Sequence, residues 1–132
     1  MEKIELKFDD IISKIKQIEF PEIDLVVAIA SGGIIPGALI ANILKKDLKI
    51  IYLNFRDENH SPIYIEPRLI KDIDFDTIGK KILLVDDVTK TGKTFEKAKN
   101  VIESSEVKTF AINGNADYSL FNYEECLIFP WN

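Results

Sequence analysis

ILLVDDVTKTGKT, the stretch from Ile82 to Thr94, decides the fold of this chain. Its first four residues are apolar, which is typical of a strand that is buried on both faces of a parallel sheet. Two acidic residues follow at the strand end, and a loop of Thr, Gly and Lys then opens into a helix. Because ligands of open α/β sheets bind at the carboxyl ends of the strands, the stretch predicts both a parallel sheet and the place of its site.

The rest of the chain repeats this alternation of strand and helix. Further apolar runs predict strands at Leu25 to Ala30, Leu48 to Leu53, Val107 to Ile112 and Leu127 to Phe129. Apolar residues at helical spacing predict helices over 8–18, from Pro36 to Leu44 and from Thr94 to Ile102. Such alternation indicates a parallel sheet covered on both sides. We therefore expect one α/β, Rossmann-like domain over residues 1–132.

The parts of the 82–94 stretch suit different pieces of a sugar phosphate. Successive side chains at a strand end point to opposite sides, so one of Asp86 and Asp87 can accept from ribose hydroxyls while the other serves a magnesium ion or orients the loop. The backbone amides of residues 90–94 and the helix N-terminus can surround a phosphate, with side-chain donors from Thr91, Lys93 and Thr94. The stretch thus predicts adjoining sites for a diol and a phosphate.

The same residues allow two other interpretations. The acidic pair can simply end a strand, with Thr91 or Thr94 capping a helix, which is the usual explanation of either piece alone. Gly92-Lys93-Thr94 also suggests a nucleoside triphosphate loop, but the first glycine of GxxxxGK[ST] would fall on Asp87. The order of strand, paired acids and loop favours the sugar phosphate site.

A glycine turn and a long insertion complete the candidate site. Ser31-Gly32-Gly33 follows the strand at 25–30, and glycines let backbone amides approach a diphosphate at a helix N-terminus. Residues 55–76 are polar and carry both arginines of the chain, Arg56 and Arg68. Either arginine can clamp phosphate when a loop closes, although solvated surface arginines are equally expected.

Composition narrows the classes of function. The net charge of −5, with both signs mixed along the chain, provides no basic stripe for nucleic acid. Cys126 is the only cysteine, so no disulfide can form within the chain. No apolar run approaches the ~20 residues that span a bilayer. We expect a soluble cytoplasmic protein that binds neither nucleic acid nor membrane.

Three motifs resemble the type I phosphoribosyltransferases. Ile82 to Thr94 is similar to their phosphoribosyl pyrophosphate signature, in which apolar residues, two acids and a loop ending T-G-x-T follow in order. The run AIASGGIIPGAL, residues 28–39, looks like the pyrophosphate loop of the xanthine-guanine branch. Leu127 to Asn132 resembles the W-x-x-F-P-W-[DE] ending of purine members. The resemblance implies a five-stranded parallel core flanked by helices, with a short, reduced hood over the base site.

The resemblance also implies roles for individual residues and a magnesium ion held through Asp87. The residues expected to take part in catalysis are Asp86, Asp87 and Lys90. Those expected to bind ribose 5-phosphate are Asp86, Asp87, Thr89, Lys90, Thr91, Gly92, Lys93 and Thr94. Pyrophosphate is expected at Ser31, Gly32, Gly33 and Arg56, and the base at Ile112, Cys126 and Leu127. By analogy with the family, we expect a homodimer acting in nucleotide salvage.

The chain departs from the family pattern at four positions of this one cleft. Ser31 replaces a basic residue, Lys90 an aspartate, Ile112 a lysine and Cys126 a tryptophan. The leading hypothesis is transfer of ribose 5-phosphate to a purine or purine-like base, with Lys90 favouring an anionic or carbonyl-rich acceptor. The alternative is a non-catalytic regulatory protein that binds phosphoribosyl pyrophosphate or a nucleotide. A kinase or NTPase using Gly92-Lys93-Thr94 is the weakest of the three.

Overall fold

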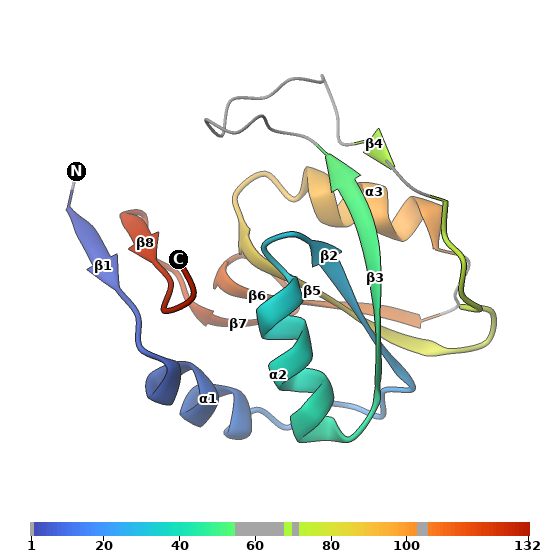
Figure 1. Cartoon of the computed structure of the whole chain (residues 1–132), viewed down its shortest axis with the longest axis horizontal. Helices are drawn as coiled ribbons and strands as arrows, with labels where there is room; N and C mark the ends of the chain where they lie inside the picture. Colours follow the sequence, from blue (N-terminus) through green and yellow to red (C-terminus); the bar gives the residue numbers. More distant parts are fainter. Residues whose placement is uncertain (1, 55–67, 70–71, 103–105) are drawn as a thin grey trace.

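A computed structural model describes residues 2–54, 68–69, 72–102 and 106–132 of the chain. A six-stranded sheet forms its centre, in the order β4-β3-β2-β5-β6-β7, and β1 and β8 form a separate two-stranded sheet (Figure 1). The helices are α1 (Phe8–Lys16), α2 (Ile34–Leu44) and α3 (Lys93–Val101). The strands are β1 (Lys3–Glu5), β2 (Leu25–Ala30), β3 (Asp47–Asn54), β4 (Arg68–Leu69), β5 (Lys81–Thr89), β6 (Glu106–Gly114), β7 (Tyr118–Phe121) and β8 (Cys126–Ile128).

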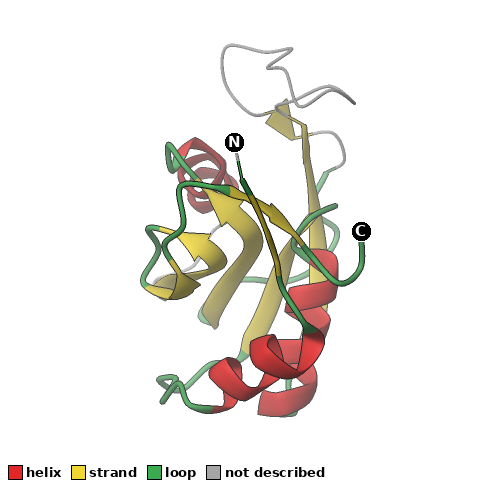
Figure 2. Ribbon diagram, turned by 90° about the vertical axis from the view of Figure 1, so that its left-hand side faces the viewer, coloured by secondary structure: helices red, strands yellow, loops and turns green. Residues whose placement is uncertain are grey.

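The central sheet is parallel from β3 to β7, and β4 joins its edge in the antiparallel direction. The alternating residues of β5 fill two cores, one on each face. Leu83 and Val85 pack in one core with α1 and α2, whereas Ile82 and Leu84 pack in the other with α3. Figure 2 shows the sheet between these helices. Helices on both faces explain why β2 and residues 82–85 of β5 are continuously apolar.

The two ends of the chain meet in the small sheet. Lys3 of β1 pairs with Cys126 of β8 in a parallel register, and the Leu6 amide donates to the Ile128 carbonyl oxygen at 2.9 Å. Figure 1 shows β1 and β8 side by side, away from the central sheet. We call β1, β8 and residues 129–132 the hood. Phe129 of the hood and Leu6, which directly follows β1, are both buried in the core of α1 and α2, so the hood packs on the body of the domain.

Most of the predicted elements are present, and one was assigned to the wrong sheet. The strand predicted at 25–30 has the predicted bounds, and the five-stranded parallel core flanked by helices is confirmed. However, its fifth strand is β7, and the strand predicted at 127–129 lies in the hood as β8. The reason is length: β1 and β8 have three residues each, too few for a periodic pattern to identify their partner.

The insertion expected between Phe55 and Asp76 is described only in part. β4 pairs with the end of β3, with Leu53 opposite Leu69, so this segment includes a short antiparallel excursion from the sheet. Residues 55–67 and 70–71 lie outside the described residues. Among the helices that are described, none combines the length and apolarity needed to cross a membrane.

Candidate active site

Strand β5 carries the acidic pair to the carboxyl edge of the sheet. It continues to Thr89, so Asp86 and Asp87 are strand residues and not part of the following loop. The Asp87 amide donates to Asp86 Oδ1 at 2.8 Å, and the Val88 amide donates to Asp87 Oδ1 at 2.7 Å. These bonds restrict the orientation of both carboxyl groups.

The glycine turn after β2 lies directly against Asp87. A methyl group on Gly32 would stand 2.5 Å from the Asp87 carboxyl carbon and 2.5 to 2.6 Å from its two oxygens. Real side chains do not approach so closely, so only glycine leaves the carboxylate its position. Gly33 is equally confined, since a methyl group there would meet the Val85 and Ile29 carbonyl oxygens. The position of the glycine turn and the position of the Asp87 carboxyl group therefore depend on each other.

The acidic pair has a perturbed ionisation. Burial of the Asp86 carboxyl group, together with the negative charge of Asp87 and a hydrogen bond with it, raises the pKa of Asp86 well above its usual range. Two carboxylates side by side resist being ionised together. A cation or the hydroxyl groups of a ligand at this position would relieve the repulsion.

The loop after β5 turns the chain into α3. Gly92 precedes the helix with a φ of 78°, a left-handed conformation that favours glycine. The Lys93 amide donates to Thr91 Oγ1 at 3.3 Å, and the Glu96 amide donates to the Gly92 carbonyl oxygen at 3.0 Å. The loop thus presents the N-terminal end of α3 at the carboxyl edge of the sheet, where backbone amides can bind an anion.

One cavity of about 870 Å³ joins the acidic pair, the loop, the glycine turn and the hood. Its lining residues from β2, the glycine turn, α2 and β3 are Ile29, Ala30, Ser31, Gly32, Ile35 and Leu53. Those from β5, the loop and α3 are Asp86, Asp87, Val88, Thr89, Lys90, Thr91, Gly92 and Thr94. The hood adds Cys126, Leu127, Phe129, Trp131 and Asn132. Most of the residues predicted from the sequence thus face one space.

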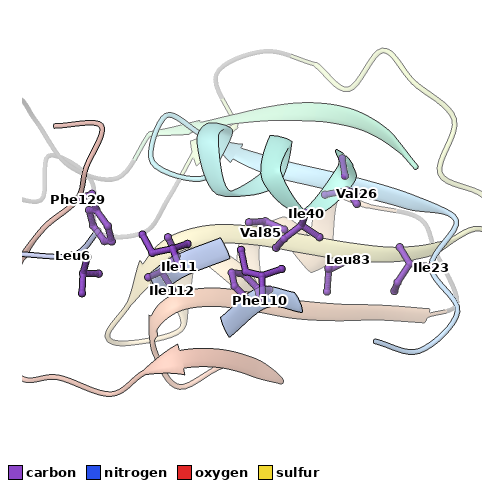
Figure 3. Close-up of a cluster of buried hydrophobic side chains, with 12 residues drawn as sticks. Leu6, Ile11, Ile23, Val26, Ile40, Leu83, Val85, Phe110, Ile112 and Phe129 are labelled. Carbon is purple, nitrogen blue, oxygen red and sulfur yellow. The ribbon is translucent and has the colours of Figure 1, made fainter. Parts of the chain in front are cut away.

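Three predicted residues that the structure describes are not in that lining. Ile112 has no exposed surface and packs in the core beside Ile11 (Figure 3), so its side chain does not reach the cavity. Gly33 is buried at the start of α2, and Lys93 is exposed on the first turn of α3 but does not face the cavity. Arg56 lies outside the described residues.

Other lining residues were not selected from the sequence. Ile35 and Leu53 carry no polar atom on their side chains, so only the structure reveals their position. Phe129 and Trp131 line the cavity and also pack in or against the core of α1 and α2. Their rings stack with centroids 5.0 Å apart, and Trp131 also lies 5.7 Å from the ring of Phe8. The aromatic C-terminal pattern was the signal that pointed to them.

The described residues of the site supply only some of the ligands that a metal ion needs. The described residues contain no group of three or more His, Cys, Asp or Glu side chains that could hold a metal ion. Asp86 and Asp87 supply hard oxygen ligands. Two such residues are enough for Mg²⁺, which binds through one or two carboxylates and takes its other ligands from water and phosphate oxygens.

Comparison with known proteins agrees with this geometry. Residues 1–113 match the phosphoribosyl transferase domain family. The transcriptional regulator GfcR of Archaeoglobus fulgidus is 32% identical over 76% of this chain and 48% of its own length. The orotate phosphoribosyltransferase of Sulfurisphaera tokodaii is 36% identical over 70% of this chain and 42% of its own. The chain therefore spans less than half of these two relatives.

Solved structures resemble the chain over its whole length. The purine phosphoribosyltransferase of Pyrococcus horikoshii superposes with a TM-score of 0.83 and 26% identity, covering 100% of this chain and 95% of its own. A hypothetical protein from Neisseria gonorrhoeae with bound ppGpp has a TM-score of 0.76 and 20% identity, over 99% and 89% of the two chains. At 20% identity, the similarity to the Neisseria gonorrhoeae protein shows the fold alone.

Proposed function

Because this chain belongs to the phosphoribosyl transferase family, of type I, we propose that it transfers ribose 5-phosphate from phosphoribosyl pyrophosphate to a purine or purine-like nucleobase. In this reaction the bond between ribose C1 and a pyrophosphate oxygen breaks, and a bond from C1 to a ring nitrogen of the base forms. Pyrophosphate leaves with the bonding electrons. The observation that carries the proposal is the single cavity that unites the acidic pair, the loop before α3 and the glycine turn.

Each wall of the cavity suits one part of this reaction. Thr91, Gly92 and Thr94 at the start of α3 bind the 5-phosphate, and the turn at Ser31 and Gly32 binds the pyrophosphate group. The oxygens of Asp86 and Asp87 accept hydrogen bonds from the ribose hydroxyls and stabilise the positive charge that develops on the ring. The hood closes the space in which the base lies.

Magnesium fits this arrangement through Asp87, with pyrophosphate oxygens and water as its remaining ligands. When bound, the ion would neutralise charge on the leaving pyrophosphate. The protein's own contribution is positional, because the backbone bond to Val88 and the contact with Gly32 fix the Asp87 carboxylate at the pyrophosphate end of the cavity.

The proposal is tested by measuring pyrophosphate release from phosphoribosyl pyrophosphate and Mg²⁺ with a panel of purine and pyrimidine bases. We expect turnover with at least one base, and a loss of about 10²-fold or more in Asp87→Asn, since a positioned charge at the reacting centre is removed. Asp47→Asn is the matched control, because Asp47 is exposed at the start of β3 and away from the cavity lining. Release of no pyrophosphate with any base would contradict the proposal.

A second candidate is a regulatory protein that binds phosphoribosyl pyrophosphate or a nucleotide without turnover. It is favoured by the identity to a transcriptional regulator and by the presence of Ser31, Lys90 and Cys126 on the cavity wall. Calorimetric titration with Mg²⁺ and phosphoribosyl pyrophosphate separates the candidates. Binding without turnover of any base supports the regulatory role, and turnover that Asp87→Asn abolishes while binding persists rejects it.

The remaining expectations are part of the same proposal. We propose a homodimer in the cytoplasm, acting in nucleotide salvage and binding small molecules but no nucleic acid. Light scattering of the purified chain tests the oligomeric state. Electrophoretic mobility of DNA and RNA fragments mixed with the protein tests whether it binds nucleic acid.

A further inference from the structure

We infer that Lys90 selects the acceptor, and that the acceptor is a heterocycle presenting carbonyl oxygens or an anionic group to the loop before α3. This inference rests on the proposed function, because it assumes that the base occupies the space beneath the hood. It concerns specificity, which neither the family match nor the relatives determine. The observations behind it are the charges and hydrogen-bonding types of the cavity wall.

Lys90 is the only cationic side chain that lines the cavity among the residues that the structure describes. It is exposed in the loop between the acidic pair and Thr91, so its ammonium group is free to move toward a ligand. Lys93, three residues along, is also exposed but does not line the cavity. The phosphate end has Thr91, Thr94 and the amides of α3 as donors. Lys90 is therefore available to the acceptor.

The chemistry of a lysine limits what it can recognise. An ammonium group has three N–H donors and no acceptor, so it pairs with carbonyl oxygens, carboxylates or deprotonated ring nitrogens, and not with N–H groups. In the hood, Leu127 and Phe129 are apolar and the Trp131 indole only donates, whereas the Asn132 amide can both donate and accept. An oxygen acceptor on the base therefore satisfies the Lys90 ammonium group, whereas an amino group in the same place does not.

The acidic pair makes this dependence sharper. Asp86 and Asp87 line the same cavity, so an anionic acceptor finds no attractive side-chain charge on the described wall other than that of Lys90. Lys90 supplies the opposite charge, and its removal should therefore penalise anionic and carbonyl-rich bases most. Binding of phosphoribosyl pyrophosphate should depend on it much less.

Kinetics with matched bases test the inference. We expect wild-type kcat/KM to be higher for xanthine, with two carbonyl groups, than for adenine, with none, and higher for orotate than for uracil, which lacks the carboxylate. Lys90→Met should reduce kcat/KM for the preferred base by about 10- to 100-fold, the value of a charge-assisted hydrogen bond. Lys90→Arg should retain the preference. Lys49→Met, on an exposed position of β3 outside the cavity, is the control.

Two results would overturn the inference. One is that adenine serves as well as xanthine, and uracil as well as orotate. The other is that Lys90→Met raises KM for phosphoribosyl pyrophosphate and leaves the ranking of bases unchanged, which would place Lys90 at a phosphate.

A binding measurement distinguishes this inference from the proposed transfer reaction. Trp131 is the single tryptophan of the chain and lines the cavity, so its fluorescence reports on ring binding without turnover. If no base is turned over, the proposed transfer fails. The inference then stands if xanthine or orotate changes the emission of the wild type with Mg²⁺ and phosphoribosyl pyrophosphate, and the change is lost in Lys90→Met. An equal response in both proteins, or none in either, rejects it.

Discussion

Replacing Gly32 by alanine should inactivate the site while leaving the fold intact. The new methyl carbon would lie 2.5 Å from the Asp87 Cγ and Oδ2 atoms, whereas unstrained contacts of carbon need about 3.5 Å. The carboxylate must therefore withdraw by about 1 Å or rotate. Asp87 is only partly buried at the cavity wall, so it can move without unfolding β5.

The expected magnitude follows from that displacement. A misplacement of about 1 Å in a positioned group costs up to about 10²-fold in rate, which corresponds to ~2.7 kcal/mol of transition-state stabilisation. Calorimetry with Mg²⁺ and phosphoribosyl pyrophosphate, together with pyrophosphate release, measures the loss. Thermal unfolding followed by circular dichroism establishes that the variant is folded.

Gly79→Ala is the matched control for this prediction. Gly79 has a φ of 73° but nothing within 4 Å of the position of a methyl group. Alanine there should cost about 1 kcal/mol of stability through backbone strain and leave ligand binding unchanged. If Gly32→Ala binds phosphoribosyl pyrophosphate as tightly as the wild type and turns it over as fast, the Asp87 carboxylate is not needed in the position described, and the argument for a joint turn and acidic pair is refuted.

Two further predictions concern stability. Because the pKa of Asp86 is raised in the folded state, the folded protein holds a proton that the unfolded chain has released, so stability should fall as pH rises from the usual aspartate pKa through the raised one. Asp86→Asn should therefore stabilise the protein at neutral pH but not below the usual aspartate pKa, as measured by urea unfolding across pH; a pH-independent effect would contradict this. Asn113 is buried, donates from Nδ2 to the Tyr123 carbonyl oxygen at 2.9 Å and accepts from the Tyr123 amide at 2.7 Å. Asn113→Ala should cost about 1–3 kcal/mol in urea unfolding, whereas the exposed Asn115→Ala should cost little, and equal effects would show that these bonds contribute no stability.

The sheet and the phosphate end of the site could be predicted because their physics is local. Residues 25–30 and 82–85 are continuously apolar since helices cover both faces of the sheet. Two glycines closely follow the first of these runs, and the two acids directly follow the second. Ser31, Asp86 and Thr91 therefore come together as soon as the two strands are placed as neighbours. The structure supplies that neighbouring position, because β3 comes between the two strands in sequence and pairs with the other side of β2.

The hood could not be predicted in the same way. β1 and β8 have three residues each and pair across 123 positions of sequence, Lys3 with Cys126, so nothing in either segment specifies the other. Ile112 was assigned to the base pocket by resemblance, yet the direction of its side chain is fixed by the alternation along β6. That alternation places Phe110 and Ile112 in the core of α1 and α2, and Ala111 in the core of α3.

The strand ends and the exposed loop and hood differ in how easily substitutions can change specificity. In the proposed function, ribose phosphate recognition depends on strand ends and on contacts as tight as that between Gly32 and Asp87, where a methyl group would displace the carboxyl group. The proposed recognition of the acceptor depends on Lys90, which is exposed in a loop, and on a hood held by three register pairs and the rings of Phe8, Phe129 and Trp131. Substitutions at the exposed positions Lys90 and Cys126 change the side chains that line the cavity without altering core packing. Departures from the family pattern at Lys90 and Cys126 are thus compatible with an intact ribose phosphate site, which is why acceptor choice is the property to measure separately.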